Sequence, residues 1–221
     1  MTASKMSSAY SRHLQLAEKA CAFLTASTDP FHAVKTATVR LEQAGFRRLS
    51  KSAALTGTNA LEAGGKYYYT VEHSTLVAFT VGQKYQAGVG GFHIVGGHTD
   101  SPNLKVKPRS KTAAGTAAGC VQLGVECYGG GLWHTWFDRD LSLSGKVLVR
   151  STTDTTATSN YTGKIETRLV NLKDPVARVS TLCIHLQSAE ERAGFSVNKE
   201  DHTRPIIATS TKSTNKNNDK D

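Results

Sequence analysis

The feature that most constrains the fold of this chain is the stretch from Gly90 to Pro102. It begins as an apolar run that contains Phe92, Ile94 and Val95, a composition typical of a short buried strand. A pair of glycines stands on each side of the run and permits the backbone to turn sharply there. The pattern therefore predicts a buried strand between two turns.

His98 and Asp100 follow at the end of this predicted strand. In α/β sheets, ligands bind just beyond the carboxyl ends of strands, which is where these two side chains are expected. A neutral imidazole can bind a divalent metal, and a carboxylate two residues further along an extended backbone can bind the same metal or orient the imidazole. The alternative is a solvated or hydrogen-bonded loop histidine, because a His-x-Asp triplet is common by chance.

Length and composition indicate a soluble protein with a buried core. The 221 residues suffice for one large domain or two small ones, and seven Tyr, seven Phe and two Trp provide large side chains for a core. No run reaches the roughly 20 apolar residues of a membrane span. The first residues lack the apolar stretch of a secretory signal. We therefore expect a cytoplasmic protein without a membrane partner.

The cysteines argue against a structural zinc site made of thiolates. All four are scattered, and none forms a Cys-x-x-Cys pair. Cys21 lies in a helix-like run and Cys183 in an apolar run, so both are expected to be buried as small hydrophobic residues. Reduced thiols are expected throughout.

The net charge of +9 raises the possibility of nucleic-acid binding. Part of this charge is concentrated at Lys105, Lys107, Arg109 and Lys111, and alternate residues share one face if the segment is a strand. No nucleic-acid-binding motif and no ladder of aromatic residues accompanies them. The cluster is better explained as a solvated strand edge or a subunit contact.

The N-terminal part of the chain has helical and then strand-like patterns. Apolar spacing predicts a helix over residues 10–26, and Asp29 can cap a second helix that begins at Pro30 and ends near Ala44. His32, just inside the second helix, is expected to be a packed or capping residue. Two strands, over 66–71 and 74–81, then form a predicted hairpin. Together with the strand before His98, these elements predict an α/β layered domain over residues 1–103.

From Leu104 onward the patterns are those of strands. Extended or alternating segments occur at 104–108, 121–128, 141–150 and 168–170, and no helix of appreciable length is expected between Leu104 and Leu182. We therefore predict a second, mainly β domain over residues 104–209. Residues 113–119 resemble a flexible spacer, and residues 210–221 contain no apolar side chain and are expected to be disordered.

Two further stretches have unusual composition. In the first, over 128–141, three glycines precede two tryptophans and an Asp-Arg-Asp triplet. A bulged strand with aromatic packing and an ion pair between Arg139 and a carboxylate would explain it structurally. In the second, His185 interrupts the apolar run 180–186. Taken alone, His185 is better explained as a buried, hydrogen-bonded histidine than as a site residue.

In their order along the chain, these stretches resemble the aspartyl aminopeptidases, a family of dinuclear zinc exopeptidases. The resemblance extends over nearly all of residues 10–209. The matching motifs are Asp29-Pro30-Phe31-His32-Ala33, the run from Gly96 to Lys107, the segment from Tyr128 to Leu143, Ile184-His185-Leu186-Gln187, and Pro205 to Thr209. Several long motifs in register are far more specific than a single triplet.

The resemblance implies a role for each candidate residue. His98 corresponds to a zinc ligand, Asp100 to the aspartate that supports the metal site during catalysis, and His185 to a substrate-binding histidine that reaches into the neighbouring subunit. The β domain corresponds to a dimerisation module inserted into the α/β metallopeptidase domain. The implied activity is release of N-terminal Asp or Glu from peptides by a homo-oligomeric enzyme with two zinc ions.

The sequence also departs from the family pattern. The metal-bridging aspartate, the catalytic glutamate and the remaining ligands of the family follow the β domain, whereas here the residues after Thr209 lack any resemblance to it. A catalytic zinc needs about three protein ligands and an open position for water. Glu190 and Glu191 lie in the β domain and are not credible replacements. We therefore expect the N-terminal portion of such an enzyme, inactive by itself.

Three alternatives follow from the same observations. The chain could be a non-catalytic partner that dimerises with a full-length subunit and supplies His185 to it. It could be a nucleic-acid binder, a hypothesis that depends on charge alone. It could also be a truncated gene product, in which a frameshift replaces the family sequence after Thr209.

Overall fold

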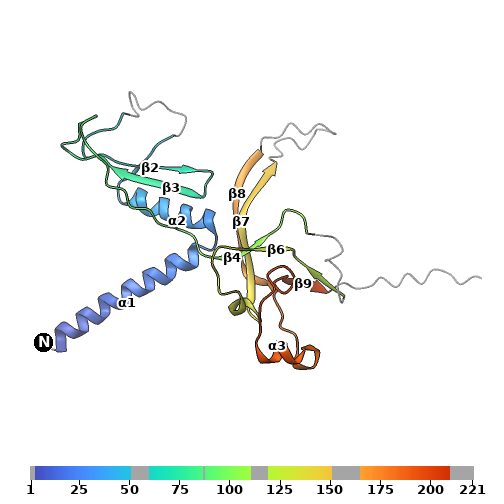
Figure 1. Cartoon of the computed structure of the whole chain (residues 1–221). Coiled ribbons are helices and arrows are strands. Elements are labelled where there is room, and N and C mark those ends of the chain that lie inside the picture. Colours follow the sequence, from blue (N-terminus) through green and yellow to red (C-terminus); the bar gives the residue numbers. More distant parts are fainter. Residues whose placement is uncertain (1–2, 51–59, 87, 111–118, 151–164, 210–221) are drawn as a thin grey trace, which may run out of the picture. The chain divides into compact units, whose positions relative to one another are not determined.

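The computed structural model describes residues 3–50, 60–86, 88–110, 119–150 and 165–209. These residues form two compact units. Unit 1 comprises residues 1–101 and 144–170, and unit 2 comprises residues 102–143 and 171–221. Helices and strands are both present, so the chain has a mixed α/β fold (Figure 1). The predicted limit between domains at residue 103 stays a prediction, as does disorder of residues 210–221, which lie outside the described part of the chain.

Unit 1 begins with two helices, as the sequence predicts. Helix α1 spans Ala3–Ala26 and α2 spans Pro30–Gln43, so α1 starts earlier than the predicted helix. Asp29 caps α2: its carboxylate accepts hydrogen bonds from the backbone N–H groups of Phe31 at 2.9 Å and His32 at 3.0 Å. Neither described helix is long and apolar enough to cross a membrane.

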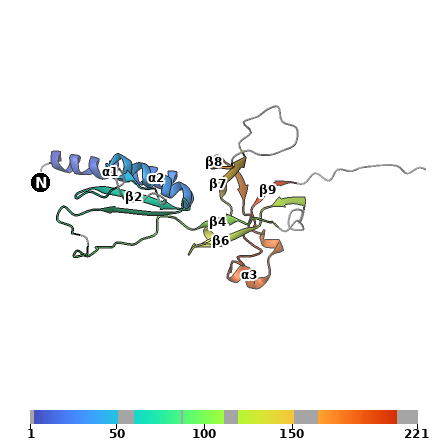
Figure 2. The ribbon, with the colours of Figure 1, turned by 90° about the horizontal axis from the view of Figure 1, so that it is seen from above.

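A small sheet packs beside α2 (Figures 1 and 2). Strand β1, Arg47–Arg48, runs parallel to β2, Lys66–Val71, which forms an antiparallel hairpin with β3, Thr75–Thr80. The predicted hairpin is confirmed. Three residues, Glu72, His73 and Ser74, connect the two strands, and Glu72 and His73 both have positive φ, as the central residues of a type I′ turn do.

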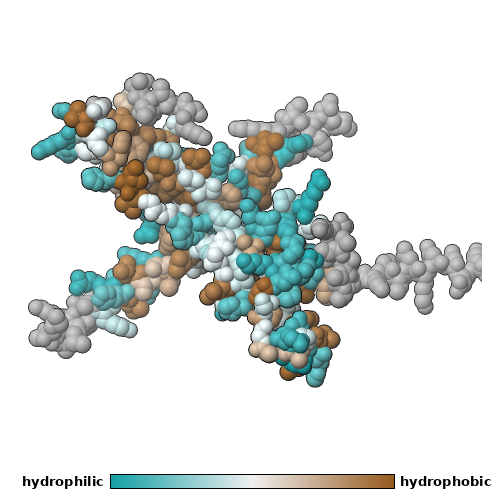
Figure 3. All heavy atoms as spheres, in the orientation of Figure 1, coloured by the Kyte–Doolittle hydropathy of each residue, from teal (hydrophilic) through white to brown (hydrophobic). Residues whose placement is uncertain are grey.

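The core of unit 1 is built around β2 and α2. Tyr67 and Tyr68 are 2% and 1% exposed, so adjacent residues on opposite faces of β2 are both covered. Tyr67 lies opposite Phe79 in the hairpin, with ring centroids 5.6 Å apart. On the other face, Tyr68 donates a short hydrogen bond to the carboxylate of Glu42 on α2. Ala33 and Val34 of α2 are buried as well, and hydrophobic residues gather over α2 and the β2–β3 hairpin in the space-filling view (Figure 3).

The predicted strand before His98 is not formed. Residues 88–102 are irregular, and Phe92, Ile94 and Val95 are 82%, 87% and 99% exposed. A strand is stabilised by ladder hydrogen bonds to neighbouring strands and by burial of its side chains, and no described element supplies either for this segment. The prediction of a buried strand is therefore wrong for the described structure, although the apolar composition that led to it remains unexplained by local contacts.

Unit 2 is mainly β in its described residues. Strand β4, Asn103–Val106, pairs antiparallel with β6, Val125–Tyr128. A second sheet has the order β5-β9-β8-β7, with β5 at Cys120–Gln122, β7 at Asp140–Arg150, β8 at Ile165–Arg178 and β9 at Ile206–Thr209. The ends of β7 and β8 nearest the 151–164 connection belong to unit 1.

The helical segments of unit 2 are short. They are the 3₁₀ helices η3, Trp133–Trp136, and η4, Ile184–Leu186, and the α-helix α3, Ala189–Ala193. Within the described residues between 104 and 182, the four-residue η3 is the longest helical segment, and residues 111–118 and 151–164 of this range lie outside the described part of the chain.

The glycine-tryptophan segment forms part of the core of unit 2. Trp133 is 6% exposed, and Asp138 adopts a positive φ of 55°. The backbone N–H of Asp138 donates to the carbonyl of Val179 at 2.8 Å, and its carboxylate accepts two hydrogen bonds from Thr181. The segment therefore joins β7 to the chain that follows β8.

Two smaller predictions are wrong. Arg139 donates to the backbone carbonyl of Thr135 at 3.0 Å, whereas the ion pair in this region joins Arg178 to Asp140 at 2.8 Å. Cys21 and Cys183 are exposed and not buried, because no described element covers their faces of α1 and the 181–186 segment. None of the four cysteines forms a disulfide within the described residues.

Candidate functional site

His98 and Asp100 lie together in unit 1, at the end of the uncovered segment. The imidazole Nδ1 of His98 is 2.8 Å from the backbone carbonyl oxygen of Asp100 and 3.7 Å from its carboxylate oxygen Oδ1. The His98 side chain is 84% exposed, and that of Asp100 is 21% exposed. The main partner of the imidazole is thus the backbone of Asp100, with its carboxylate somewhat further away.

This contact determines which nitrogen of His98 is available to a metal. A carbonyl oxygen only accepts hydrogen bonds, so the 2.8 Å contact places the proton on Nδ1. The neutral imidazole then has its lone pair on Nε2, which faces solvent on this exposed side chain. Hydrogen bonding of one ring nitrogen to a backbone carbonyl is the usual way in which proteins orient a metal-binding histidine.

The described residues nevertheless do not form a complete zinc site. Nowhere in the described ranges do three or more His, Cys, Asp or Glu side chains gather in a way that could hold a metal ion. A catalytic zinc needs about three protein ligands. His98 and Asp100 have side chains suited to one part of a zinc site. The described residues alone do not provide enough ligands for a catalytic zinc.

His185 belongs to unit 2, where it lies on η4 and is exposed. The three apolar side chains around it are exposed too: Leu182 by 54%, Ile184 by 61% and Leu186 by 70%. His185 is therefore not the buried, hydrogen-bonded histidine expected from the apolar run alone. Exposed apolar side chains next to one another are typical of a surface that contacts another molecule.

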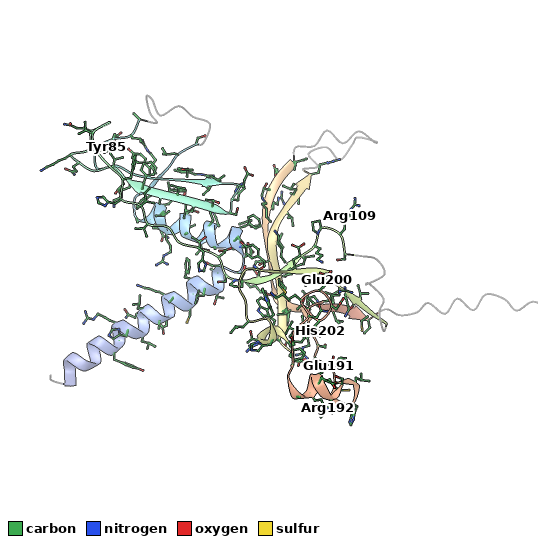
Figure 4. All side chains as sticks on the ribbon, viewed as in Figure 1. Tyr85, Arg109, Glu191, Arg192, Glu200 and His202 are labelled. Carbon is green, nitrogen blue, oxygen red and sulfur yellow. The ribbon has the colours of Figure 1, made fainter. Side chains whose placement is uncertain are left out.

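The η4 turn is held in place by a residue that the sequence analysis did not single out. Nη1 of Arg192 on α3 donates to the carbonyl of Gln187 at 2.5 Å and to that of Ile184 at 3.4 Å (Figure 4). Helix α3 begins with a capping box, in which Ser188 and Glu191 exchange side-chain and backbone hydrogen bonds. The Ser-x-x-Glu spacing is a sequence signature of a helix start and could have predicted α3.

Two lysines of the basic cluster, Lys105 on β4 and Lys107 just after it, contact other residues of unit 2. The ammonium of Lys105 lies 5.8 Å from the centroid of the Tyr128 ring, and that of Lys107 forms an ion pair with Glu200 at 2.9 Å. Both cations thus already have partners from their own unit. This arrangement supports the interpretation as a strand edge over the one as a nucleic-acid surface.

His32 and Asp29 form a half-buried histidine–carboxylate pair at the start of α2. Nδ1 of His32 lies 2.6 Å from Oδ2 of Asp29, with side-chain exposures of 15% and 9%. Burial acts to raise the pKa of Asp29, but hydrogen bonds from Ser144 and His32 outweigh it and leave the pKa below its usual value. The predicted capping role of this part of the chain is confirmed, and the histidine is packed against the cap.

Comparison with known proteins relates these residues to a family. A model of the family described as aminopeptidase I zinc metalloprotease (M18) matches residues 23–221. The match includes the residues after Thr209, so the expectation that they lack any resemblance to the family is wrong. A probable aspartyl aminopeptidase of Ricinus communis is 45% identical over 190 residues, which are 86% of this chain and 36% of that protein. The chain thus spans little more than a third of the length of this relative.

Solved structures give the same relation. In the cryo-EM structure of the Ape4 and Nbr1 complex, a chain superposes with a TM-score of 0.72 and 37% identity, over 90% of this chain and 35% of that one. The S. cerevisiae mApe1 dodecamer superposes with a TM-score of 0.60 and 24% identity, over 91% and 40% of the two chains. This second likeness supports the fold alone.

Proposed function

Because the chain belongs to the M18 aminopeptidase I zinc metalloprotease family, we propose that it is the N-terminal portion of an aspartyl aminopeptidase, a hydrolase that releases N-terminal Asp or Glu from peptides. The family match over residues 23–221 carries this proposal. In it, His98 provides one zinc ligand through Nε2, and Asp100 orients the imidazole and supports the metal site. A zinc ion would supply a water activated for attack on the peptide bond.

The same proposal states that this chain is inactive by itself. Its support is the donor count, since the described residues bring no third ligand to His98 and Asp100. The exposed segment with Phe92, Ile94 and Val95 supports it as well. An apolar segment that immediately precedes a ligand and lacks a cover is where further chain of an M18 fold would pack.

The experiment that tests this is hydrolysis of an N-terminal aspartyl peptide by the purified chain with added zinc. We expect no turnover from the chain alone, and turnover when it is co-expressed with the part of the Ricinus communis relative that it does not match. His98→Ala should abolish the restored activity, whereas His93→Ala, an exposed histidine of the same segment, should leave it unchanged. Turnover by the chain alone would refute incompleteness, and unaffected activity in H98A would refute the ligand role.

A second candidate function, that of a non-catalytic partner subunit, rests on the exposure of His185. One solved structure with this fold, that of S. cerevisiae mApe1, is a dodecamer. In this proposal, the β-rich part of the chain pairs with a full-length subunit, and His185 contacts the substrate bound there. In a mixed assembly, His185→Ala should raise KM without weakening co-purification. Failure of the chain to co-purify with a full-length relative would exclude this function.

The proposal of an aspartyl aminopeptidase also includes a location in the cytoplasm and the use of two zinc ions by the complete enzyme. The nucleic-acid hypothesis depends on net charge alone, and two cations of the basic cluster, Lys105 and Lys107, have partners within unit 2. Filter binding that weakens steeply with salt would be needed to revive it.

A further inference from the structure

A cavity of about 210 Å³ lies in unit 1, and neither His98 nor Asp100 belongs to its lining. One wall is a face of α2, because Val34, Thr38 and Glu42 recur at helical spacing. The buried ring of Tyr68 on β2 forms another part of the lining. The cavity is therefore built mainly from the helix and the strand that make up the core of this unit.

The lining contains two cations and one acidic residue. Lys35 from α2 and Arg48 from β1 carry full positive charges, and His73 from the hairpin turn lies beside them in the lining. Glu42 is the only acidic residue of the lining, and its carboxylate already accepts the hydroxyl of Tyr68. Neither Lys35 nor Arg48 forms an ion pair with another residue in the described ranges.

The charge of Arg48 acts on the Tyr68 hydroxyl, which belongs to the lining of the cavity. The pKa of Tyr68 is raised by burial, by its hydrogen bond to Glu42 and by the charge of Glu42, while the guanidinium of Arg48 acts in the opposite direction. Arg47, the preceding residue, is directed elsewhere: its guanidinium lies 5.1 Å from the Tyr67 ring centroid and donates to the carbonyl of Ala60 at 3.1 Å. Successive strand residues point to opposite faces, so the two arginines have different environments.

We propose that this cavity binds a small organic carboxylate. Arg48 and Lys35 supply the donors for the carboxylate group, whereas the hydroxyl of Thr38 in the same lining already donates to the carbonyl of Lys35 at 2.8 Å. Phe31, Val34 and Leu169 offer an apolar wall for a short hydrocarbon part. The volume restricts the ligand to a few carbon atoms, since sites for drug-sized molecules start at about 300 Å³. This site is independent of the proposed peptidase function.

The test is calorimetric titration of the full chain with succinate at constant ionic strength, because salt would screen exposed cations. Saturable binding is expected, and Arg48→Gln and Lys35→Gln should each weaken it at least tenfold. Arg47→Gln is the matched control and should change the affinity less than twofold. Since Lys35 and Arg48 are both exposed, their variants should retain the circular dichroism spectrum of the parent chain.

Two further ligands separate the parts of the proposal. Neutral succinamide should not bind, because it lacks the charge that Arg48 recognises, and inorganic phosphate should bind more weakly than succinate, because it makes no use of the apolar wall. Absence of saturable succinate binding, an equal loss in R47Q and R48Q, or tighter binding of phosphate than of succinate would each overturn the assignment.

Discussion

Asp29 is the residue whose replacement should most clearly destabilise unit 1. Its carboxylate caps α2 through the N–H groups of Phe31 and His32, contacts the His32 ring at 2.6 Å and accepts a hydrogen bond from Ser144. Loss of an N-cap costs about 1 kcal/mol, and each further hydrogen bond contributes a net value of about 1 kcal/mol. Asp29→Ala should therefore lower the free energy of unfolding by about 2–3 kcal/mol.

The effect of Asp29 should also depend on pH. Its pKa in the folded chain lies below the reference value of 3.8, so its ionised form contributes stability at pH values above 3.8. That contribution is lost as the pH falls through the folded pKa. Asp29→Asn retains an oxygen that can cap the helix but cannot ionise, so its deficit relative to the parent should shrink as the pH drops below about 4.

Urea denaturation followed by circular dichroism, between pH 3 and pH 7, measures both effects. Asp174→Asn is the matched control, because Asp174 is an exposed acid on β8 and its loss should change stability by less than about 0.5 kcal/mol. The reasoning fails if D29A unfolds within about 0.5 kcal/mol of the parent chain. It also fails if the deficit of D29N is the same at pH 3 as at pH 7.

Three other changes test separate parts of the structure. Gly131→Ala would place a methyl group 2.9 Å from the buried Trp133 ring and should cost about 1–3 kcal/mol by thermal unfolding, whereas the same change one residue earlier, where nothing lies within 4 Å, should not. Tyr68→Phe removes the hydroxyl bound to Glu42 and should lower stability by about 1–3 kcal/mol in urea. Arg192→Ala removes both hydrogen bonds from Nη1 to the η4 turn, so amide hydrogen exchange there should accelerate about tenfold. Arg192→Lys should restore part of the protection.

The features that could be predicted from sequence are those set by interactions between residues close together in the chain. Asp29 followed by Pro30 defines the start of α2, since the cap and the first helical residue are adjacent. The β2–β3 hairpin follows from two β-prone runs separated by a short polar turn. The capping box at Ser188 and Glu191 belongs to the same class, because its two partners are three residues apart.

Burial could not be predicted in the same way, because it depends on what packs against a segment from elsewhere. Cys21 and Cys183 occupy apolar runs, yet both are exposed since no described element reaches them. The segment with Phe92, Ile94 and Val95 has the composition of a buried strand, but these side chains are exposed and the segment forms no strand. Its apolar side chains suit a sheet with neighbours on both sides, and the described chain provides none.

The candidate metal site combines both kinds of determinant. The orientation of the His98 ring depends on the carbonyl of a residue two positions away, so it is already present in the chain as described. Tight zinc binding depends on the number of ligands that converge, which is a long-range property. If the proposed function is right, zinc affinity will therefore report assembly: it should be weak for the isolated chain and rise steeply when a second polypeptide supplies the remaining ligands, while the tautomer of His98 stays the same in both states.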